Sequence, residues 1–119
     1  MEDFIIREID RMGEMLMKIA RRLGLIGDNV PDYSLATVKE EFDKASIHLD
    51  LDSILQHENP VRHLVENENL SAQGLETFIE IVFHSDLDED RKTALLEDAL
   101  TFLDGKGYYS FKLHSLGNH

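Results

Sequence analysis

Apolar side chains recur through the first 25 residues at intervals that alternate between four and three positions. The stripe is formed by Ile5, Ile9, Met12, Leu16, Ile19 and Leu23. Because an α-helix has 3.6 residues per turn, this spacing places all six side chains on one face. The pattern therefore predicts a long amphipathic helix over residues 2–25, with Gly24 and Gly27 as its stop signals.

The remaining sequence predicts shorter helices, each marked by apolar residues three or four positions apart and by cap residues at its ends. One helix is expected at 35–49 after the N-cap Ser34, and another at 72–83 after the N-cap Ser71. Between them, residues 50–69 form a broken stretch, in which Asp52 or Ser53 could cap one turn and Pro60 starts another. The last two helices are expected at 88–104, before the stops Gly105 and Gly107, and at 108–116. No segment shows the alternation of a strand, so no sheet is expected. The sequence predicts an all-α fold: one domain over 1–119, with about five to six helices packed as antiparallel hairpins.

The distribution of charge excludes some classes of partner. The chain has 12 basic and 24 acidic residues, a net charge of −12. Residues 1–24 carry five of each sign, so the whole acidic excess lies beyond residue 24, and such a surface repels phosphate backbones. The sequence has no cysteine and no run of about 18 apolar residues. We therefore expect a cytoplasmic protein that binds neither nucleic acid nor membrane.

Three segments carry a resemblance to a known family. They are the opening Asp3-Phe4-Ile5-Ile6-Arg7-Glu8-Ile9, the segment Leu49-Asp50-Leu51-Asp52, and Leu95-Leu96-Glu97-Asp98-Ala99-Leu100-Thr101-Phe102-Leu103. On these segments the chain resembles short all-helical bacterial proteins of an uncharacterised family, a domain of unknown function with a partial tetratricopeptide-like hairpin at its carboxyl end. The resemblance implies a fold rather than an activity. Two full repeats of about 34 residues cannot be laid on the sequence, so any repeat is partial.

Four acidic residues suggest a calcium loop. Asp86, Asp88, Asp90 and Glu97 fall at positions 1, 3, 5 and 12 of an EF-hand, but the loop requires glycine at position 6, where this chain has Arg91. Acidic residues also gather at helix starts, because the helix dipole is positive there. We therefore predict that this segment is the amino-terminal end of a helix and does not bind calcium.

The chain has six histidines, of which His57 and His63, with Glu58, form the closest cluster of possible metal ligands. No two histidines have the i, i+4 spacing of a zinc-binding helix, and no thiolate can complete a structural zinc site. We predict no metal and no cofactor. Whether His57, Glu58 and His63 have a role is left open.

The sequence contains no signature of catalysis. Ser34 and Ser71 suit helix caps better than nucleophiles, and neither a nucleophile elbow nor a phosphate-binding glycine loop is present. We therefore predict that the protein is not an enzyme.

The densest aromatic cluster is formed by Tyr108, Tyr109 and Phe111. At helical spacing, Tyr108 and Phe111 share a face with nearby leucines, which is typical of core packing. We expect at least two of these three rings to be buried. The alternative is that they anchor a partner at an interface.

These observations favour a non-enzymatic helical interaction module that binds a protein partner or itself. The alternatives are a small-molecule or metal-binding regulatory domain and, third, an enzyme whose site has no sequence signature. The apolar arc of the first helix is wider than one core contact needs, which predicts a homodimer with Ile6, Gly13, Met17 and Ala20 at its interface. The competing interpretation of that wide arc is a central helix that the others wrap.

Overall fold

The computed structural model describes residues 11–25 and 33–117, and all regular structure in these ranges is helical. The helices are α2 (Arg11–Arg22), α3 (Leu35–Lys44), α4 (Leu51–Gln56), α5 (Pro60–Glu66), α6 (Ala72–Phe83), α7 (Glu89–Gly105) and α8 (Phe111–Gly117). The predicted all-α fold is confirmed. The described ranges hold seven helices rather than five to six, because the broken stretch 50–69 forms both α4 and α5. The first part of the predicted amino-terminal helix, residues 2–10, lies outside the described residues.

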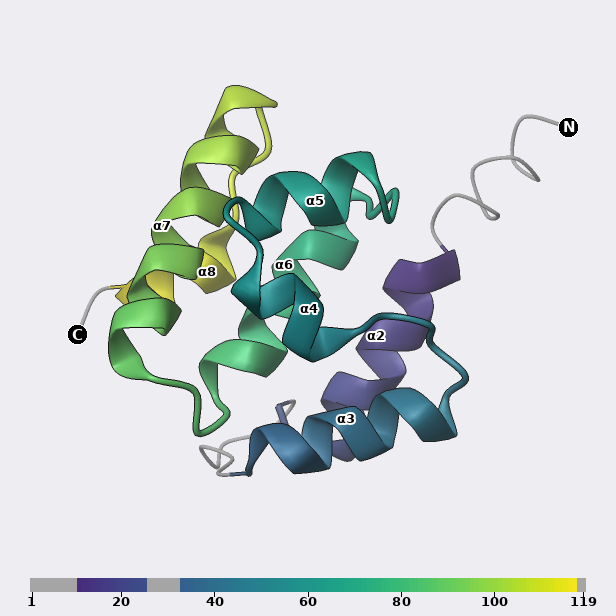
Figure 1. Cartoon of the computed structure of the whole chain (residues 1–119). Coiled ribbons are helices and arrows are strands. Elements are labelled where there is room, and N and C mark those ends of the chain that lie inside the picture. Colours follow the sequence, from purple (N-terminus) through teal and green to yellow (C-terminus); the bar gives the residue numbers. More distant parts are fainter. Residues whose placement is uncertain (1–10, 26–32, 118–119) are drawn as a thin grey trace, which may run out of the picture.

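Helix α6 holds the central position in the fold. Seven of its twelve residues are buried, and Leu75, Phe78 and Val82 have no exposed surface. It packs against α2, α3, α5, α7 and α8, and Figure 1 shows it between α2 on one side and α7 and α8 on the other. A helix that is apolar over most of its circumference is stable only when neighbours cover it, which explains this arrangement. No helix in the described part of the chain is long and apolar enough to cross a membrane.

The helix starts follow local capping chemistry. The hydroxyl of Ser34 accepts a hydrogen bond from the backbone of the third residue of α3, Ser71 does the same for α6, and Pro60 is the first residue of α5, as predicted. The predicted cap of α4 was wrong. Its N-cap is Asp50, whose carboxylate accepts from the backbone N–H of Ser53 at 3.2 Å.

The helix ends correct one predicted boundary. Helix α3 stops at Lys44 rather than near Leu49, because Ser46 adopts a positive φ of 59° and closes the end with the two backbone bonds of a Schellman motif. Leu49 is still buried, but in the connection to α4. Gly24 and Gly107 close α2 and α7 in the same way, as their positions predicted.

Candidate interaction surfaces

The small residues of α2 lie against α6. Gly13 is buried and Ala20 is 1% exposed, so both are covered within the chain. A Cβ added at Gly74 of α6 would lie 3.5 Å from the Cα of Gly13, so the two helix backbones approach each other closely at these glycines. The close approach expected of small residues therefore occurs between two helices of one chain.

The other two predicted interface residues are Met17 and Ile6. Met17 is half-buried, and its sulfur accepts a weak hydrogen bond from the hydroxyl of Thr77 on α6 at 3.4 Å. Ile6 lies outside the described residues. Self-association through the first helix stays a prediction, but any such contact must use a side of α2 that α6 leaves free.

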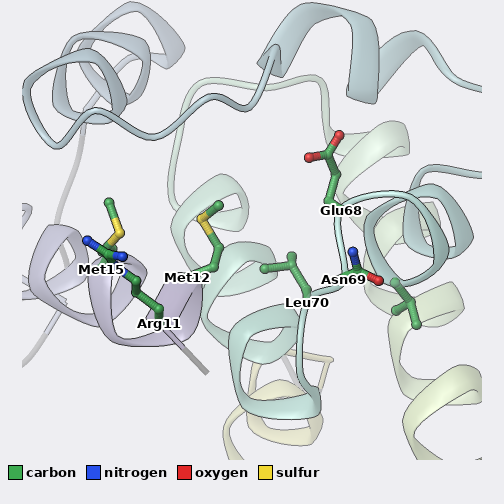
Figure 2. Close-up of a pocket in the computed structure, with 7 residues that line it drawn as sticks. Arg11, Met12, Met15, Glu68, Asn69 and Leu70 are labelled. Atoms are coloured by element: carbon green, nitrogen blue, oxygen red, sulfur yellow. The ribbon is translucent and has the colours of Figure 1, made fainter. Parts of the chain in front are cut away.

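An apolar groove runs along one free side of α2. It has a volume of about 670 Å³ and lies between α2 and the segment that connects α5 to α6. Figure 2 shows the Leu70 side chain directed toward Met12, with Glu68 on the same side of the groove as Leu70. Met15 lines the groove one turn further along α2 and is half-buried. Methionine side chains are flexible and polarisable, so a surface of this kind adapts to an apolar partner.

Helix α2 is basic, in contrast to the rest of the described chain. It carries Arg11, Lys18, Arg21 and Arg22 against the single acid Glu14, whereas residues 33–117 carry seventeen acids and seven bases. All five of these side chains are exposed. Arg22 pairs with Glu41 of α3 at 3.0 Å, and the other three bases form no ion pair within the described ranges. Of these four bases, Arg11 lines the apolar groove, and the acidic Glu68 lines its other wall.

A second surface is formed by two aromatic rings at the start of α8. Tyr109 is 66% exposed and Phe111 is 75% exposed, and they are the two large hydrophobic side chains that are exposed in the described part of the chain. The prediction that at least two of the three clustered rings are buried was wrong. Tyr108 is half-buried, and the deeply buried residue of this segment is Ser110, at 1% exposure.

The buried hydroxyl of Ser110 explains why the rings point outward. It donates to a carboxylate oxygen of Glu76 on α6 at 2.5 Å and accepts from the backbone N–H of Leu113 at 3.2 Å, which caps α8. The hydroxyl of Tyr108 also contacts Glu76, at 3.5 Å. Ser110 therefore faces α6, and its neighbours Tyr109 and Phe111 face away. Serine is a favoured N-cap residue, so Ser110 was the sequence signal that predicts a helix beginning at Phe111.

The carboxylate of Glu80 lies one turn after Glu76 on α6. Burial raises its pKa above the ordinary value of 4.5, while Lys112 opposes the shift and Glu76 adds to it. The folded state therefore favours the protonated form of Glu80 more strongly than the unfolded chain does. The stability that this preference provides is complete below the ordinary pKa and is lost as the pH rises through the raised pKa.

We expect Glu80→Gln to raise the urea midpoint at neutral pH, because the neutral amide does not incur the cost of burying a charge. The gain should vanish near pH 4, where the wild-type side chain is itself protonated. Glu97→Gln, an exposed change on α7, serves as the matched control and should leave the urea midpoint unchanged both at neutral pH and near pH 4. A Glu80→Gln protein that is no more stable than the wild type at pH 7 would contradict this assignment.

The aromatic rings have cationic neighbours in the sequence. Residues 105–117 contain Lys106 and Lys112 and no acid. The ring of Tyr109 stacks on His114 with 4.6 Å between centroids and 12° between planes, and Phe111 lies 6.5 Å from Tyr109. Tyr109 and Phe111, which are exposed, and the half-buried His114 together form what we call the α8 aromatic surface.

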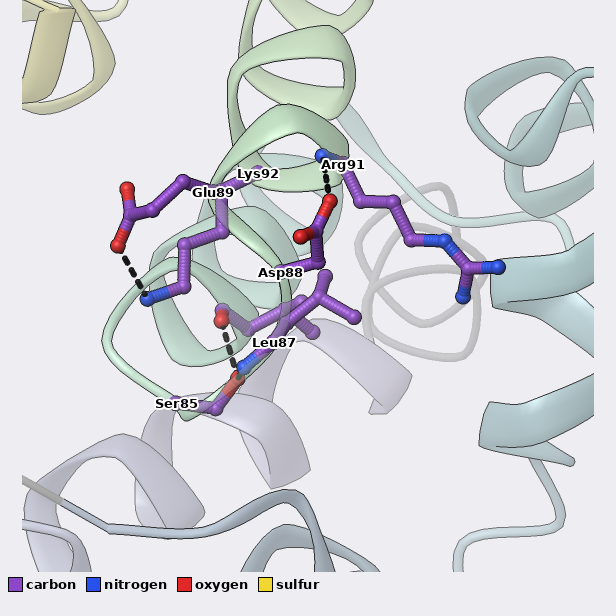
Figure 3. A network of polar contacts seen from close by, with 7 residues as sticks. Ser85, Leu87, Asp88, Glu89, Arg91 and Lys92 are labelled. Carbon is purple, nitrogen blue, oxygen red and sulfur yellow. Dashed lines mark hydrogen bonds and ion pairs between the residues drawn. The ribbon is translucent and has the colours of Figure 1, made fainter.

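The acidic segment at the start of α7 is used for capping, as predicted. Asp88 is the N-cap of α7 and accepts from the backbone N–H of Arg91, the residue that occupies the glycine position of a calcium loop (Figure 3). Lys92 reaches back to Glu89 at 3.5 Å in the same network. Asp86 accepts from the first backbone N–H of α3 at 2.8 Å, so it serves a different helix. The acids therefore diverge to separate structural partners.

The histidine cluster is partly brought together. The rings of His57 and His63 lie 4.8 Å apart at 32°, and Glu58 is exposed beside a hollow of about 180 Å³ that His57 also lines. The backbone N–H of Asn59 donates to Nδ1 of His57, and Nε2 of His63 lies 3.7 Å from the carboxylate of Glu68. Among the described residues, no group of three or more potential ligands could hold a metal ion.

Comparisons of the chain with protein-family models, with curated proteins and with solved structures give no significant match. The resemblance to an uncharacterised helical family, the tetratricopeptide-like hairpin and the antiparallel packing of the helices therefore stay predictions.

Proposed function

We propose that this chain is a non-enzymatic helical interaction domain that binds another protein through its α8 aromatic surface. The observation that carries the proposal is the exposure of Tyr109 and Phe111, at 66% and 75%. Tyrosine is among the residues most enriched at the energetic centres of protein interfaces. Burying an apolar side chain as large as phenylalanine contributes about 1.5–3 kcal/mol, so two exposed rings represent a large unused binding energy.

The rings are presented by a rigid base, which supports a role in recognition. Ser110 and Leu113 are buried on either side of Phe111 along the chain, at 1% and 0% exposure, and they fix the start of α8 on α6. A side chain that is already held in place loses less conformational entropy when a partner covers it.

The proposal predicts that the α8 aromatic surface is required for capturing a partner from native lysate. The immobilised wild-type chain should retain a specific protein, and Tyr109→Ser/Phe111→Ser should lose at least 90% of it, since hot-spot truncations of about 2 kcal/mol or more each weaken binding many-fold. The matched control is His48→Ser/Gln56→Ser, which changes two exposed side chains in the α3–α4 region. Equal retention by both double variants would overturn the assignment of this surface.

The alternative function, a small-molecule or metal-binding regulatory domain, makes a different prediction. A ligand present at 100 times its dissociation constant stabilises a protein by about 2.7 kcal/mol. A thermal-shift screen against metal ions and metabolites therefore separates the two functions. The interaction proposal expects no shift of that size, and a reproducible one that His57→Ala or His63→Ala abolishes would favour the alternative.

A further inference from the structure

The ring of His114 lies between helix α7 and the exposed ring of Tyr109. His114 is the fourth residue of α8, where its backbone N–H donates to the carbonyl oxygen of Ser110 at 3.1 Å. Its side chain is 33% exposed, and Nε2 lies 3.8 Å from a carboxylate oxygen of Asp104 near the end of α7. The ring stacks on that of Tyr109, with 4.6 Å between the centroids and 12° between the planes. His114 therefore connects the body of the protein to a ring on its surface.

The contribution of this histidine is not a hydrogen bond from Nε2. That atom is buried and has no hydrogen-bond partner among the described residues, and Asp104 is too far away to accept from it. An ion pair with Asp104 exists only while the ring is protonated. A buried polar atom without a partner costs stability, so the fold alone would favour an apolar ring at this position. What His114 does supply is a flat face for the phenol ring of Tyr109.

The ring of Tyr109 has little other support. It is 66% exposed, and the neighbouring ring of Phe111, 6.5 Å away at 60°, is itself 75% exposed. An exposed side chain that moves freely must be immobilised when a partner covers it, and the lost entropy weakens binding. Stacking on a half-buried ring removes part of that cost before the partner arrives.

We propose that His114 is a positioning residue, which holds the ring of Tyr109 in its binding orientation without contacting the partner itself. The inference rests on the proposed function, because it assigns a role to one member of the α8 aromatic surface. It divides that surface into two rings that the partner covers, Tyr109 and Phe111, and one ring that supports Tyr109. Binding energy at Tyr109 then depends on a side chain that lies behind the contact.

Substitutions at position 114 test this role on the free full-length chain. The order parameter of the Tyr109 ring, from carbon-13 relaxation of a tyrosine-labelled sample, should fall in His114→Ala because the stacking face is gone. It should keep its wild-type value in His114→Phe, which retains a flat ring. His114→Leu fills the space without such a face and should resemble His114→Ala. The chain has three tyrosines, and the spectrum of Tyr109→Ser identifies the signal of Tyr109.

The same variants should change the affinity for the protein that the wild-type chain retains from lysate. His114→Ala and His114→Leu should weaken binding about two- to tenfold, the cost of ordering one side chain, whereas His114→Phe should bind as the wild type does. The matched control is His63→Ala on α5, which removes a half-buried histidine that also lies against another ring, that of His57. It should leave both the order of Tyr109 and the affinity unchanged.

A Tyr109 ring that is as ordered in His114→Ala as in the wild type would overturn the inference. So would a His114→Leu protein that matches His114→Phe, since packing rather than stacking would then hold the ring, or a His114→Phe protein that matches His114→Ala. Circular dichroism of each variant should show the wild-type helical signal, and recovery in His114→Phe excludes misfolding as the cause of the loss.

Failure of this inference is distinguishable from failure of the proposed function. The order parameter is measured without a partner, so it tests His114 even if no protein is captured. If instead Tyr109→Ser/Phe111→Ser loses the partner while His114→Ala keeps both the wild-type order and the wild-type affinity, the proposed function holds and the positioning role is wrong.

Discussion

Replacing Phe78 with alanine is expected to lower the free energy of unfolding by about 3–5 kcal/mol, the range for removing a large buried aromatic side chain. Phe78 has no exposed surface and lies in the middle of α6, the helix against which most of the others pack. Its ring is 6.3 Å from that of Phe42 on α3, so the substitution also removes an aromatic contact between helices. The total free energy of unfolding of a small domain is about 5–15 kcal/mol, so this loss should be evident in urea denaturation.

The matched control is the same substitution at Phe111, which is 75% exposed. Phe111→Ala should change the free energy of unfolding by less than about 0.5 kcal/mol, the usual range for surface positions. The pair of measurements separates a core role from a binding role for two identical side chains. Similar destabilisation by both changes would mean that Phe111 belongs to the core and that the α8 aromatic surface is misassigned.

The contact between α2 and α6 should be equally sensitive to added volume. We expect Gly74→Val to destabilise the fold by about 1–3 kcal/mol, as overpacking of a tight contact does. A Cβ at this position would lie 3.3 Å from the side chains of Leu70 and Ser71 and 3.5 Å from the backbone of Gly13. The two further methyl groups of valine have no free space and must push α2 away from α6. Thermal unfolding followed by circular dichroism measures the loss.

Two control substitutions should destabilise the fold less than Gly74→Val does. Gly74→Ala should cost much less, because the flexible tips of Leu70 and Ser71 can yield and because alanine gains about 1 kcal/mol of helix propensity over glycine. Gly105→Ala, at the end of α7, meets no atom within 4 Å and should be neutral or slightly stabilising. If the Gly74→Val protein were as stable as the wild type, the conclusion that α2 approaches α6 closely would be wrong.

The helix starts could be predicted from the sequence because each depends on a few neighbouring residues. Ser34, Ser71 and Pro60 mark their helices through side-chain oxygens or a fixed φ that act within one turn. Asp88, Glu89 and Asp90 were correctly assigned to a helix start for the same reason, since Asp88 caps α7 and the other two lie in its first turn. The misplaced cap of α4 shows the limit, because Asp50, Asp52 and Ser53 all favour an N-cap and lie within four positions of one another.

The aromatic surface could not be predicted by spacing alone. Starting the last helix at Tyr108 assigned Tyr108 and Phe111 to a buried face, whereas the helix begins at Phe111 after the cap Ser110. The buried position belongs to a serine because Glu76 of α6, distant in the sequence, supplies an acceptor for its hydroxyl. A hydrogen bond between residues that are 34 positions apart produces no periodic pattern in the sequence.

The sequence also could not predict which helix packs against the small residues of α2. Gly13 and Ala20 indicate that some helix backbone approaches closely, but either a second copy or another helix of the same chain satisfies that pattern. The glycine at position 74 of α6 decides for an internal contact. The side of α2 that bears Arg11 and Met15 is then the one that remains open to another molecule.

The most direct test of an interaction domain is to cross-link its partner in living cells. A photoreactive benzoylphenylalanine introduced at position 111 should yield, on irradiation, a discrete adduct between this chain and another protein chain, whereas the same probe at the exposed position 97 of α7 should not. The adduct should disappear when Tyr109→Ser is added to the probe-bearing chain, because the neighbouring ring is part of the same surface. The absence of any adduct from position 111, or equal adducts from both positions, would contradict the assignment of the α8 aromatic surface as a binding site.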